Sequence, residues 1–184
     1  MAFNEEPGYV FYRSGEAAPQ APGIALGADL TCELWKPSLG RIRPKGIQSG
    51  LPRLRARWLM HYLHLFATRE YSIFLIRRGE RPVHHSLVQP KYFRVPALAR
   101  DDLEITSTWT EPEFRGRGLA AFAIQEIVRR LGSPGRHFWY LTRENNLPSI
   151  RAAEKGGLVR FAEGKRTRRL GLRILGSFVV HPMR

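Results

Sequence analysis

The sequence is poor in cysteine and has no long hydrophobic run. Cys32 is the only cysteine among 184 residues, so an intrachain disulfide is excluded and a reducing compartment is expected. The most apolar helical segment, residues 58–66, contains His61 and His64 and is too short to span a bilayer. Glu5 and Glu6 interrupt the N-terminal region, which lacks the apolar run of a secretory signal. We therefore expect a cytoplasmic protein with no transmembrane segment.

Acidic residues are also scarce. The chain has 16 Asp and Glu residues against 30 Lys and Arg, which gives a formal net charge of +14 and a pI near 11.0. Such a chain attracts anions, among them nucleotide cofactors, nucleotide sugars, acidic carrier proteins and nucleic acid. Basic substrates such as histone-like tails are disfavoured by the same charge, and a merely solvated basic surface is the alternative interpretation.

The usual signatures of nucleophilic and metal catalysis are missing. No Ser-His-Asp or Cys-His arrangement is legible, and Cys32 lies in a Pro- and Gly-rich region without a local motif. His61 and His64 are spaced for one helix face, but no cysteine or acidic residue accompanies them, so packing is the favoured role. We expect no metal site.

The hydrophobic pattern predicts an alternation of strands and helices. Proline and glycine make residues 17–27 and 35–50 loops, and the second loop carries the basic cluster of Lys36, Arg41, Arg43 and Lys45. Helical spacing covers residues 54–68, 119–131 and 148–155. Strands are predicted at 9–13, 72–77, 81–87, 103–109, 137–141, 158–162 and 170–180, with a basic hairpin tip of Lys165, Arg166, Arg168 and Arg169.

Strict alternation along the strand at 103–109 would place its side chains on two faces. Leu103, Ile105, Ser107 and Trp109 fall on one face. Glu104, Thr106 and Thr108 fall on the other.

The most informative segment is residues 114–120, Phe-Arg-Gly-Arg-Gly-Leu-Ala, between a predicted strand and a predicted helix. Glycine lets a backbone approach a ligand closely, and a helix N-terminus offers unpaired N–H groups. Together they favour a diphosphate site. Gly116, Gly118 and Ala121 also nearly fit a dinucleotide-binding loop, but the chain downstream lacks the further βαβ units that such a fold needs.

Two segments carry a family resemblance. Residues 115–120 fit the pyrophosphate motif Arg/Gln-x-x-Gly-x-Gly/Ala, and Asn146-Leu147-Pro148-Ser149-Ile150 followed by Glu154-Lys155-Gly156-Gly157 is similar to a second family stretch. The chain therefore resembles the GNAT superfamily of acyl-CoA N-acyltransferases over roughly residues 70–180. The resemblance implies a single mixed α/β domain with a mostly antiparallel sheet flanked by helices. Residues 1–69 would form its N-terminal strand, loop and helix region, and residues 70–184 its acyl-CoA-binding core.

The resemblance also implies how acetyl-CoA, or another acyl-CoA, would bind as co-substrate. Backbone amides of the glycine turn would cradle the diphosphate, the splayed strand edge would pair with pantetheine, and a backbone N–H there would polarise the thioester carbonyl. The residues concerned are Thr108, Trp109, Thr110, Arg115, Gly116, Arg117, Gly118, Leu119, Ala120 and Asn146.

Candidate catalytic residues follow from the same comparison and from position. Glu104, 11 residues before Arg115, stands where some family members carry a catalytic glutamate, and it would be the general base. Ala153 replaces the tyrosine that often protonates the thiolate, so Tyr140 on the preceding strand is the substitute candidate. His85 would contact the acceptor or act as an auxiliary base.

These residues predict an N-acyltransferase that moves an acetyl group from coenzyme A to an amine by direct attack in a ternary complex. The charge favours a small anionic acceptor, such as a nucleotide-linked amino sugar. One alternative is an acidic acyl carrier protein as donor, bound by Lys165 and Arg166. Another is a nucleic-acid-binding module that stacks bases on residues 138–140, although the recognised signatures are absent. In this family the C-terminal hairpin often mediates dimers, so the resemblance allows a homodimer.

Overall fold

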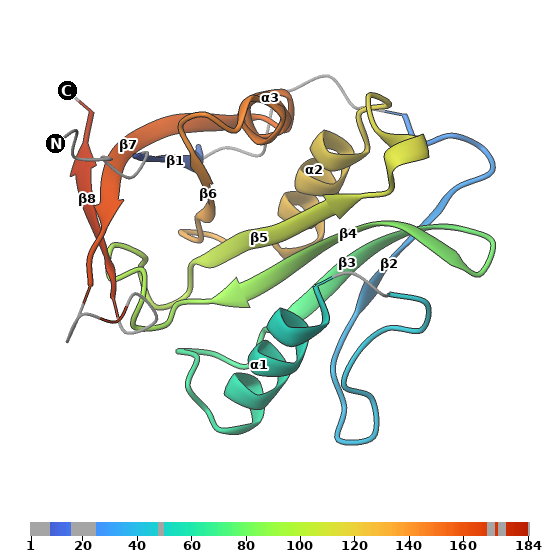
Figure 1. The fold of residues 1–184 in the computed structure, drawn as a ribbon, viewed down its shortest axis with the longest axis horizontal. Coiled ribbons are helices and arrows are strands. Elements are labelled where there is room, and N and C mark those ends of the chain that lie inside the picture. Colours follow the sequence, from blue (N-terminus) through green and yellow to red (C-terminus); the bar gives the residue numbers. More distant parts are fainter. Residues whose placement is uncertain (1–7, 16–24, 48–49, 169–171, 173–175, 184) are drawn as a thin grey trace, which may run out of the picture.

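The computed structural model describes residues 8–15, 25–47, 50–168, 172 and 176–183. These residues form a mixed α/β domain around an eight-stranded sheet of order β2-β3-β4-β5-β6-β1-β7-β8 (Figure 1). Neighbouring strands are antiparallel except β5 and β6, which confirms the predicted fold class. The strands are β1 (Tyr9–Ser14), β2 (Thr31–Trp35), β3 (Ser72–Arg78), β4 (Arg81–Pro90), β5 (Leu103–Thr110), β6 (Phe138–Arg143), β7 (Leu158–Arg166) and β8 (Phe178–Pro182). The helices are α1 (Leu51–Tyr62), α2 (Leu119–Leu131) and α3 (Leu147–Lys155), with the short 3₁₀ helix η1 (Pro112–Phe114).

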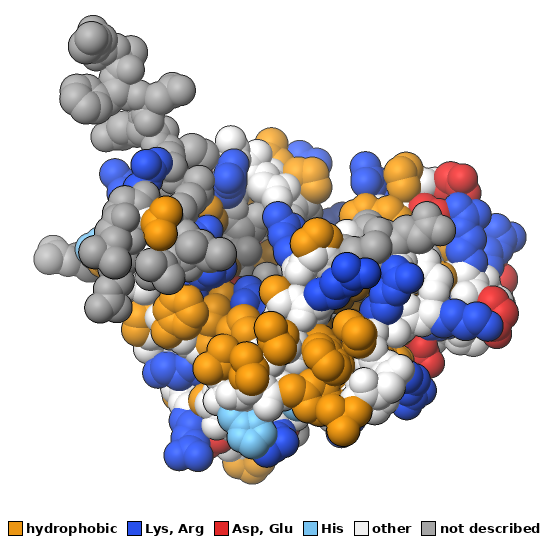
Figure 2. Space-filling view, turned by 60° about the horizontal axis from the view of Figure 1, so that its bottom comes forward, with side chains coloured by type: hydrophobic (Ala, Val, Ile, Leu, Met, Phe, Trp, Pro, Cys, Tyr) orange, Lys and Arg blue, Asp and Glu red, His pale blue; other side chains and the backbone are white. Residues whose placement is uncertain are grey.

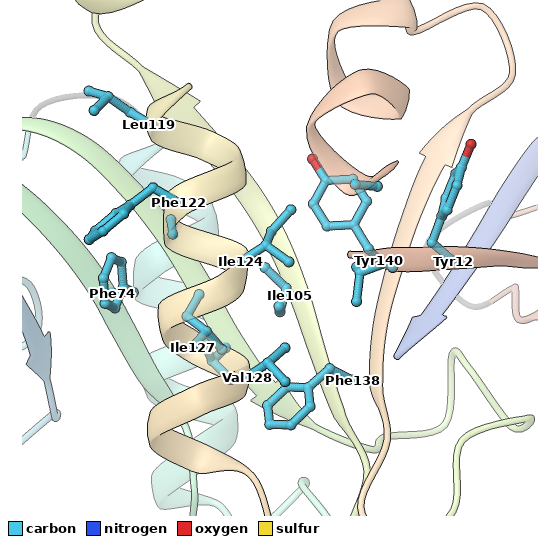
Figure 3. Packing of buried hydrophobic residues seen from close by; sticks show 14 of the residues in the cluster. Tyr12, Phe74, Ile105, Leu119, Phe122, Ile124, Ile127, Val128, Phe138 and Tyr140 are labelled. Carbon is cyan, nitrogen blue, oxygen red and sulfur yellow. The ribbon is translucent and has the colours of Figure 1, made fainter. Parts of the chain in front are cut away.

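Helix α2 forms as the sequence predicts, because its apolar residues recur every three to four positions. Ala123, Ile124 and Ile127 are completely buried against the sheet, and Phe122 packs near Phe74 of β3 (Figure 3). Each of the two fully buried isoleucines contributes about 1.5–3 kcal/mol to folding. Helix α3 packs on the same face beside α2, so these two helices share one core cluster.

Helix α1 covers the opposite face of the sheet (Figure 1), where Leu54 packs in a second core cluster with Leu87 and Trp139. The predicted extension to residue 68 is wrong, because His64 adopts a left-handed conformation with φ 57° just after the helix ends at Tyr62. Leu63 and Leu65, which follow the helix end, are exposed rather than buried, and so is Leu59 within the helix. Figure 2 shows hydrophobic side chains gathered on this face with Lys and Arg side chains around them.

The first strand of the chain lies inside the sheet. β1 pairs antiparallel with both β6 and β7, and Phe11 at its centre is completely buried. The Tyr12 hydroxyl donates to Glu154 of α3 at 2.9 Å, and burial together with this carboxylate raises the pKa of Tyr12 to about 12. The N-terminal strand thus connects the C-terminal part of the sheet to α3.

One strand was not predicted, and one loop prediction is wrong. Residues 31–35, of which only Trp35 was assigned to a loop, form β2 and pair with residues 73–77 of β3 at the edge of the sheet. Lys165 and Arg166, predicted at a hairpin tip, lie in β7 opposite Val179 and Phe178. Residues 17–24 of the first predicted loop, and residues 169–171 and 173–175 of the last predicted hairpin, lie outside the described residues.

Helices α2 and α3 approach each other closely at Gly156, and a substitution there tests this packing. A Cβ at this position would lie 2.7 Å from Ile124 Cγ2 and 3.0 Å from the Ala152 carbonyl oxygen, although the backbone φ of −74° suits any residue. We expect Gly156→Ala to lower the free energy of unfolding by about 1–3 kcal/mol through overpacking. Denaturant unfolding measures this, and Gly40→Ala, where nothing lies within 4 Å, is the matched control. Equal stability of the two variants would contradict the packing described.

Candidate active site

A bulge in β5 decides which way the side chains of the site point. His85 of β4 stands opposite Trp109, whereas Leu87 stands opposite Thr106, so β5 carries one residue more than β4 in this interval. Ser107 absorbs the extra residue with a left-handed φ of 49°. The strict alternation predicted for residues 103–109 is therefore wrong after Thr106. Thr108 bonds to Ser86 on the α2 face of the sheet, whereas Glu104 bonds to Gln89 on the α1 face.

A cleft opens where β5 and β6 part. Their parallel pairing covers Leu103–Ile105 and Phe138–Tyr140, and a cavity of about 550 Å³ follows it toward the C-terminal ends of the two strands. Most of the predicted coenzyme A residues line this cavity. They are Thr108, Trp109, Thr110, Arg115, Gly116, Gly118, Leu119 and Ala120, and the predicted acid Tyr140 lines it as well.

Arg117 and Asn146 are not among the lining residues. The Arg117 guanidinium lies 5.0 Å from the centroid of the Phe114 ring. Asn146 caps α3, because its side-chain oxygen accepts the backbone N–H of Ser149 at 3.4 Å. Asn146 therefore acts locally on the helix that forms one wall of the cleft.

The wall of the cleft formed by the glycine turn suits an anion. Gly116 and Gly118 have φ of 76° and 78°, a left-handed conformation that glycine adopts without strain, and Gly118 is the N-cap of α2. No side chain caps this helix and no acidic residue occupies its first turn. Among the described lining residues Arg115, Arg151 and Lys155 carry positive charge and none is acidic. The exposed amides and these cations favour a phosphate-bearing ligand.

A chain of hydrogen bonds supports the floor of the cleft. His84 Nδ1 lies 2.7 Å from Thr110 Oγ1, His84 Nε2 lies 3.1 Å from Ser86 Oγ, and Ser86 Oγ lies 3.0 Å from Thr108 Oγ1. Burial lowers the pKa of His84 to about 3, with a further contribution from His85, so its imidazole is neutral at physiological pH. This chain orients two threonine hydroxyls that border the cleft.

Two smaller cavities lie next to Trp109. One of about 140 Å³ is lined by Arg53, Leu54, His85, Leu87 and Trp109 among others. The other, of about 370 Å³, is lined by Gly46, Ile47, Arg81, Pro82, His85, Trp109 and Glu111. Since Trp109 also lines the large cleft, one residue borders all three spaces. The His85 ring stacks on it at 5.6 Å between centroids, and burial lowers the pKa of His85 to about 4.

The two predicted bases, His85 and Glu104, differ in whether they border a cavity. His85 borders both small cavities, whereas Glu104 lines none of the three. The Glu104 carboxylate is buried and accepts Gln89 Nε2 at 2.7 Å. Burial raises the pKa of Glu104, and the Gln89 hydrogen bond and the charges of Arg57 and Arg94 oppose that rise only in part.

The predicted proton donor, Tyr140, and Ala153, which stands where a tyrosine was expected, are both buried at α3. Tyr140 lies under this helix with its hydroxyl toward it (Figure 3), and Ala153 is packed in the core.

Sequence reasoning missed Glu111. The signal available was an acidic residue directly after a strand that ends beside the glycine turn.

The described residues contain no group of three or more His, Cys, Asp and Glu side chains that could hold a metal ion. None of the helices in the described ranges is both long and apolar enough to cross a membrane.

The two buried histidines predict acid sensitivity. Their pKa values in the fold, about 3 and about 4, lie below the ordinary 6.5, so the unfolded chain takes up protons first as the pH falls below 6.5. Stability is therefore lost as the pH falls from 6.5 to about 3 for His84 and to about 4 for His85, on the order of 1–2 kcal/mol per histidine by about pH 5. Glu104, with its raised pKa, acts in the opposite direction, since its contribution is lost as the pH rises.

Thermal unfolding at about pH 7.5 and about pH 5 measures this effect. We expect a lower Tm at the acidic pH and a smaller difference for His85→Gln. The exposed His64, as His64→Gln, is the control that keeps the full difference. An unchanged Tm of the unmodified protein across this range would refute the assignment of two neutral buried imidazoles.

Comparison with known families agrees with this geometry. The model of the acetyltransferase (GNAT) family matches residues 39–158, well over half of the chain. No curated protein shows significant similarity to the sequence.

Solved structures share the fold at low sequence identity. A GNAT-family acetyltransferase-like structure from Novosphingobium aromaticivorans has a TM-score of 0.52 and 15% identity over 85% of this chain and 61% of its own. A GCN5-related N-acetyltransferase-like protein from Streptococcus suis gives 0.54 and 16% over 85% and 61%. A tandem GNAT protein from the clavulanic acid biosynthesis pathway gives 0.55 and 13% over 85% and 51%. The chain thus spans about half to three-fifths of the structures it matches, and it belongs to the GNAT acetyltransferase family.

Proposed function

We propose that the chain is an acyl-CoA-dependent N-acyltransferase that transfers an acetyl group to the amine of a small anionic acceptor. The observation that carries the proposal is the cleft between the diverging β5 and β6, which ends at the positive-φ glycine turn and the uncapped N-terminus of α2. Membership of the family supports acyl transfer, and the cleft supports coenzyme A as the carrier of the acyl group.

The residues of the cleft divide the binding of coenzyme A between them. Amides of the turn from Gly116 to Ala120 would hold the diphosphate, with Arg115 adding a charge-assisted contact. The open edge of β5 at Thr108–Thr110 would pair with the pantetheine amides, since β6 is no longer paired there. An acetyl thioester bound in this way supplies an activated acyl carbon near Trp109.

The acceptor would approach from the other side of Trp109. His85 borders both small cavities and is neutral, so we assign it the proton that the amine must lose before attack. Tyr140, in the wall of the cleft, would protonate the departing thiolate. We assign no step to Glu104, because its carboxylate is covered by Gln89 and borders no cavity.

Positive charge around the small cavities supports an anionic acceptor such as a nucleotide-linked amino sugar. Arg53 lines one cavity, and the loop that carries Arg41, Arg43 and Lys45 reaches the other through Gly46 and Ile47. Arg43 stabilises this loop, because its guanidinium donates a hydrogen bond to the Ile47 carbonyl at 3.0 Å.

Gly118→Trp tests the coenzyme A site. A bulky side chain at the N-cap would fill the cradle, and we expect acetyl-CoA affinity, measured by calorimetry, to fall about a hundredfold or more. Gly135→Trp is the matched control, because Gly135 has nearly the same φ of 76° and open space around it but does not line the cleft. If both variants bind acetyl-CoA with equal affinity, the diphosphate does not bind at this turn.

Thiol release from acetyl-CoA in the presence of a panel of amines tests the transfer itself. We expect turnover with anionic amino sugars to exceed turnover with neutral primary amines, because cationic side chains border the acceptor cavities. Turnover with neutral amines alone would disprove the anionic acceptor and leave the transfer intact. Absence of acetyl-CoA binding would disprove both.

A further inference from the structure

The larger of the two acceptor-side cavities has one acidic lining residue among those described, Glu111. Glu111 directly follows β5, and its backbone N–H donates to the Val83 carbonyl at 2.9 Å, which fixes it against β4. The side chain is only 16% exposed. A carboxylate is therefore held on a rigid part of the sheet, in the same cavity as His85 and Trp109.

The two oxygens of this carboxylate are in different situations. Oε1 accepts a hydrogen bond from Arg81 Nη2. Oε2 is buried and has no hydrogen-bond partner among the described residues. A buried carboxylate oxygen that lacks a donor costs free energy, so this atom indicates a donor that a ligand would supply.

The surroundings define the chemistry of that donor. The Arg81 guanidinium pairs with Oε1 of the carboxylate and leaves Oε2 without a partner, and a carboxylate oxygen attracts a positively charged donor. The indole of Trp109 and the stacked ring of His85 border the same cavity, and aromatic faces attract organic cations. A primary ammonium group satisfies both the unpaired oxygen and the aromatic wall.

We infer that Glu111 Oε2 receives the ammonium group of the acceptor and selects for a primary amine beside Trp109. The inference deepens the proposed function and rests on it, because Trp109 also borders the cleft assigned to the thioester. Glu111 is here a binding residue. The ammonium gives one proton, by way of the neutral His85, to solvent and becomes the neutral amine, whose lone pair forms the N–C bond to the thioester carbon. The C–S bond then breaks, the nitrogen loses its second proton, and the departing thiolate takes up one proton.

This assignment divides the acceptor into two parts. The amine lies at Glu111, and an anionic group lies toward Arg53 or the basic loop that contributes Gly46 and Ile47. A molecule that carries both groups matches both signs of charge found around the cavities. The strongly positive net charge alone predicts only the anionic part.

The experiment uses ethylammonium chloride as the probe and needs no knowledge of the natural acceptor. The indole N–H signal of Trp109, assigned with Trp109→Phe, is followed by NMR in the full chain while the probe is titrated at constant ionic strength. We expect a saturable shift with ethylammonium and none with ethanol, which has a similar shape but no charge. Titrations with and without coenzyme A separate failure of this site from failure of the coenzyme A site.

Three variants give the test its specificity. Glu111→Gln is expected to weaken ethylammonium binding about tenfold or more, because a charge-assisted hydrogen bond is lost. Glu113→Gln removes the same charge 3.9 Å from the same Arg81 but leaves an exposed residue outside the cavity, so binding should stay unchanged. Arg81→Gln should retain or strengthen binding, because the arginine competes for the carboxylate.

The inference is overturned if the unmodified protein shows no saturable shift. It is also overturned if Glu111→Gln binds like the unmodified protein, or if Glu113→Gln loses as much. Signal dispersion in the same spectra reports whether each variant is folded. If Glu111→Gln does not fold, nuclear Overhauser contacts between the probe's ethyl group and Trp109 in the unmodified protein decide the question, and their absence counts against the site.

Discussion

The residue inserted into β5 at Ser107 is the constraint on which the rest of the site depends. β5 and β6 pair only as far as Ile105 and Tyr140, and beyond this point β5 bulges against β4. The bulge leaves one edge of β5 open and reverses the faces to which its side chains point. Thr108 and Thr110 therefore bond to the His84 network, while Trp109 faces His85 and the acceptor cavities. A bulge of a single residue thus separates the large cleft, the proposed donor side, from the two small cavities, the proposed acceptor side.

Burial keeps the two histidines at this point neutral. His84 is completely buried and linked to Ser86 and Thr110, so it supports the wall of the cleft. His85, one residue on, points to the opposite face, where it stacks on Trp109. His84 thus supports the large cleft and His85 borders the two small cavities, because adjacent side chains of a strand lie on opposite faces.

Local signals predicted the parts of the fold that local chemistry determines. The apolar period of residues 119–131 gave the bounds of α2, and the glycine turn before it lies in the cleft as expected. β2 was missed because it is a short edge strand whose alternation, with Cys32 and Leu34 toward the core and Glu33 between them, covers only five residues of a Pro- and Gly-rich region. The bulge at Ser107 was missed because a left-handed serine carries no signal of its own.

Long-range pairing limited the rest of the prediction. Nothing near residues 9–14 indicates that they lie between β6 and β7, since those contacts span most of the chain. The importance of Glu111 depends on Arg81 and Val83 across the sheet, and Glu104 is covered by Gln89 from the neighbouring strand. The predicted family motif located the cleft. Only tertiary contacts, however, distinguish Glu111, which borders a cavity, from Glu104, which is buried and borders none.

Hydrogen–deuterium exchange with and without acetyl-CoA tests the central claim most directly, because the claim concerns unpaired backbone amides in known places. The account predicts that acetyl-CoA protects the amides of residues 116–120 and of the open β5 edge at residues 108–110, while the amides of β7 and β8 exchange as before. Protection confined to other elements, or no protection at saturating acetyl-CoA, would contradict it.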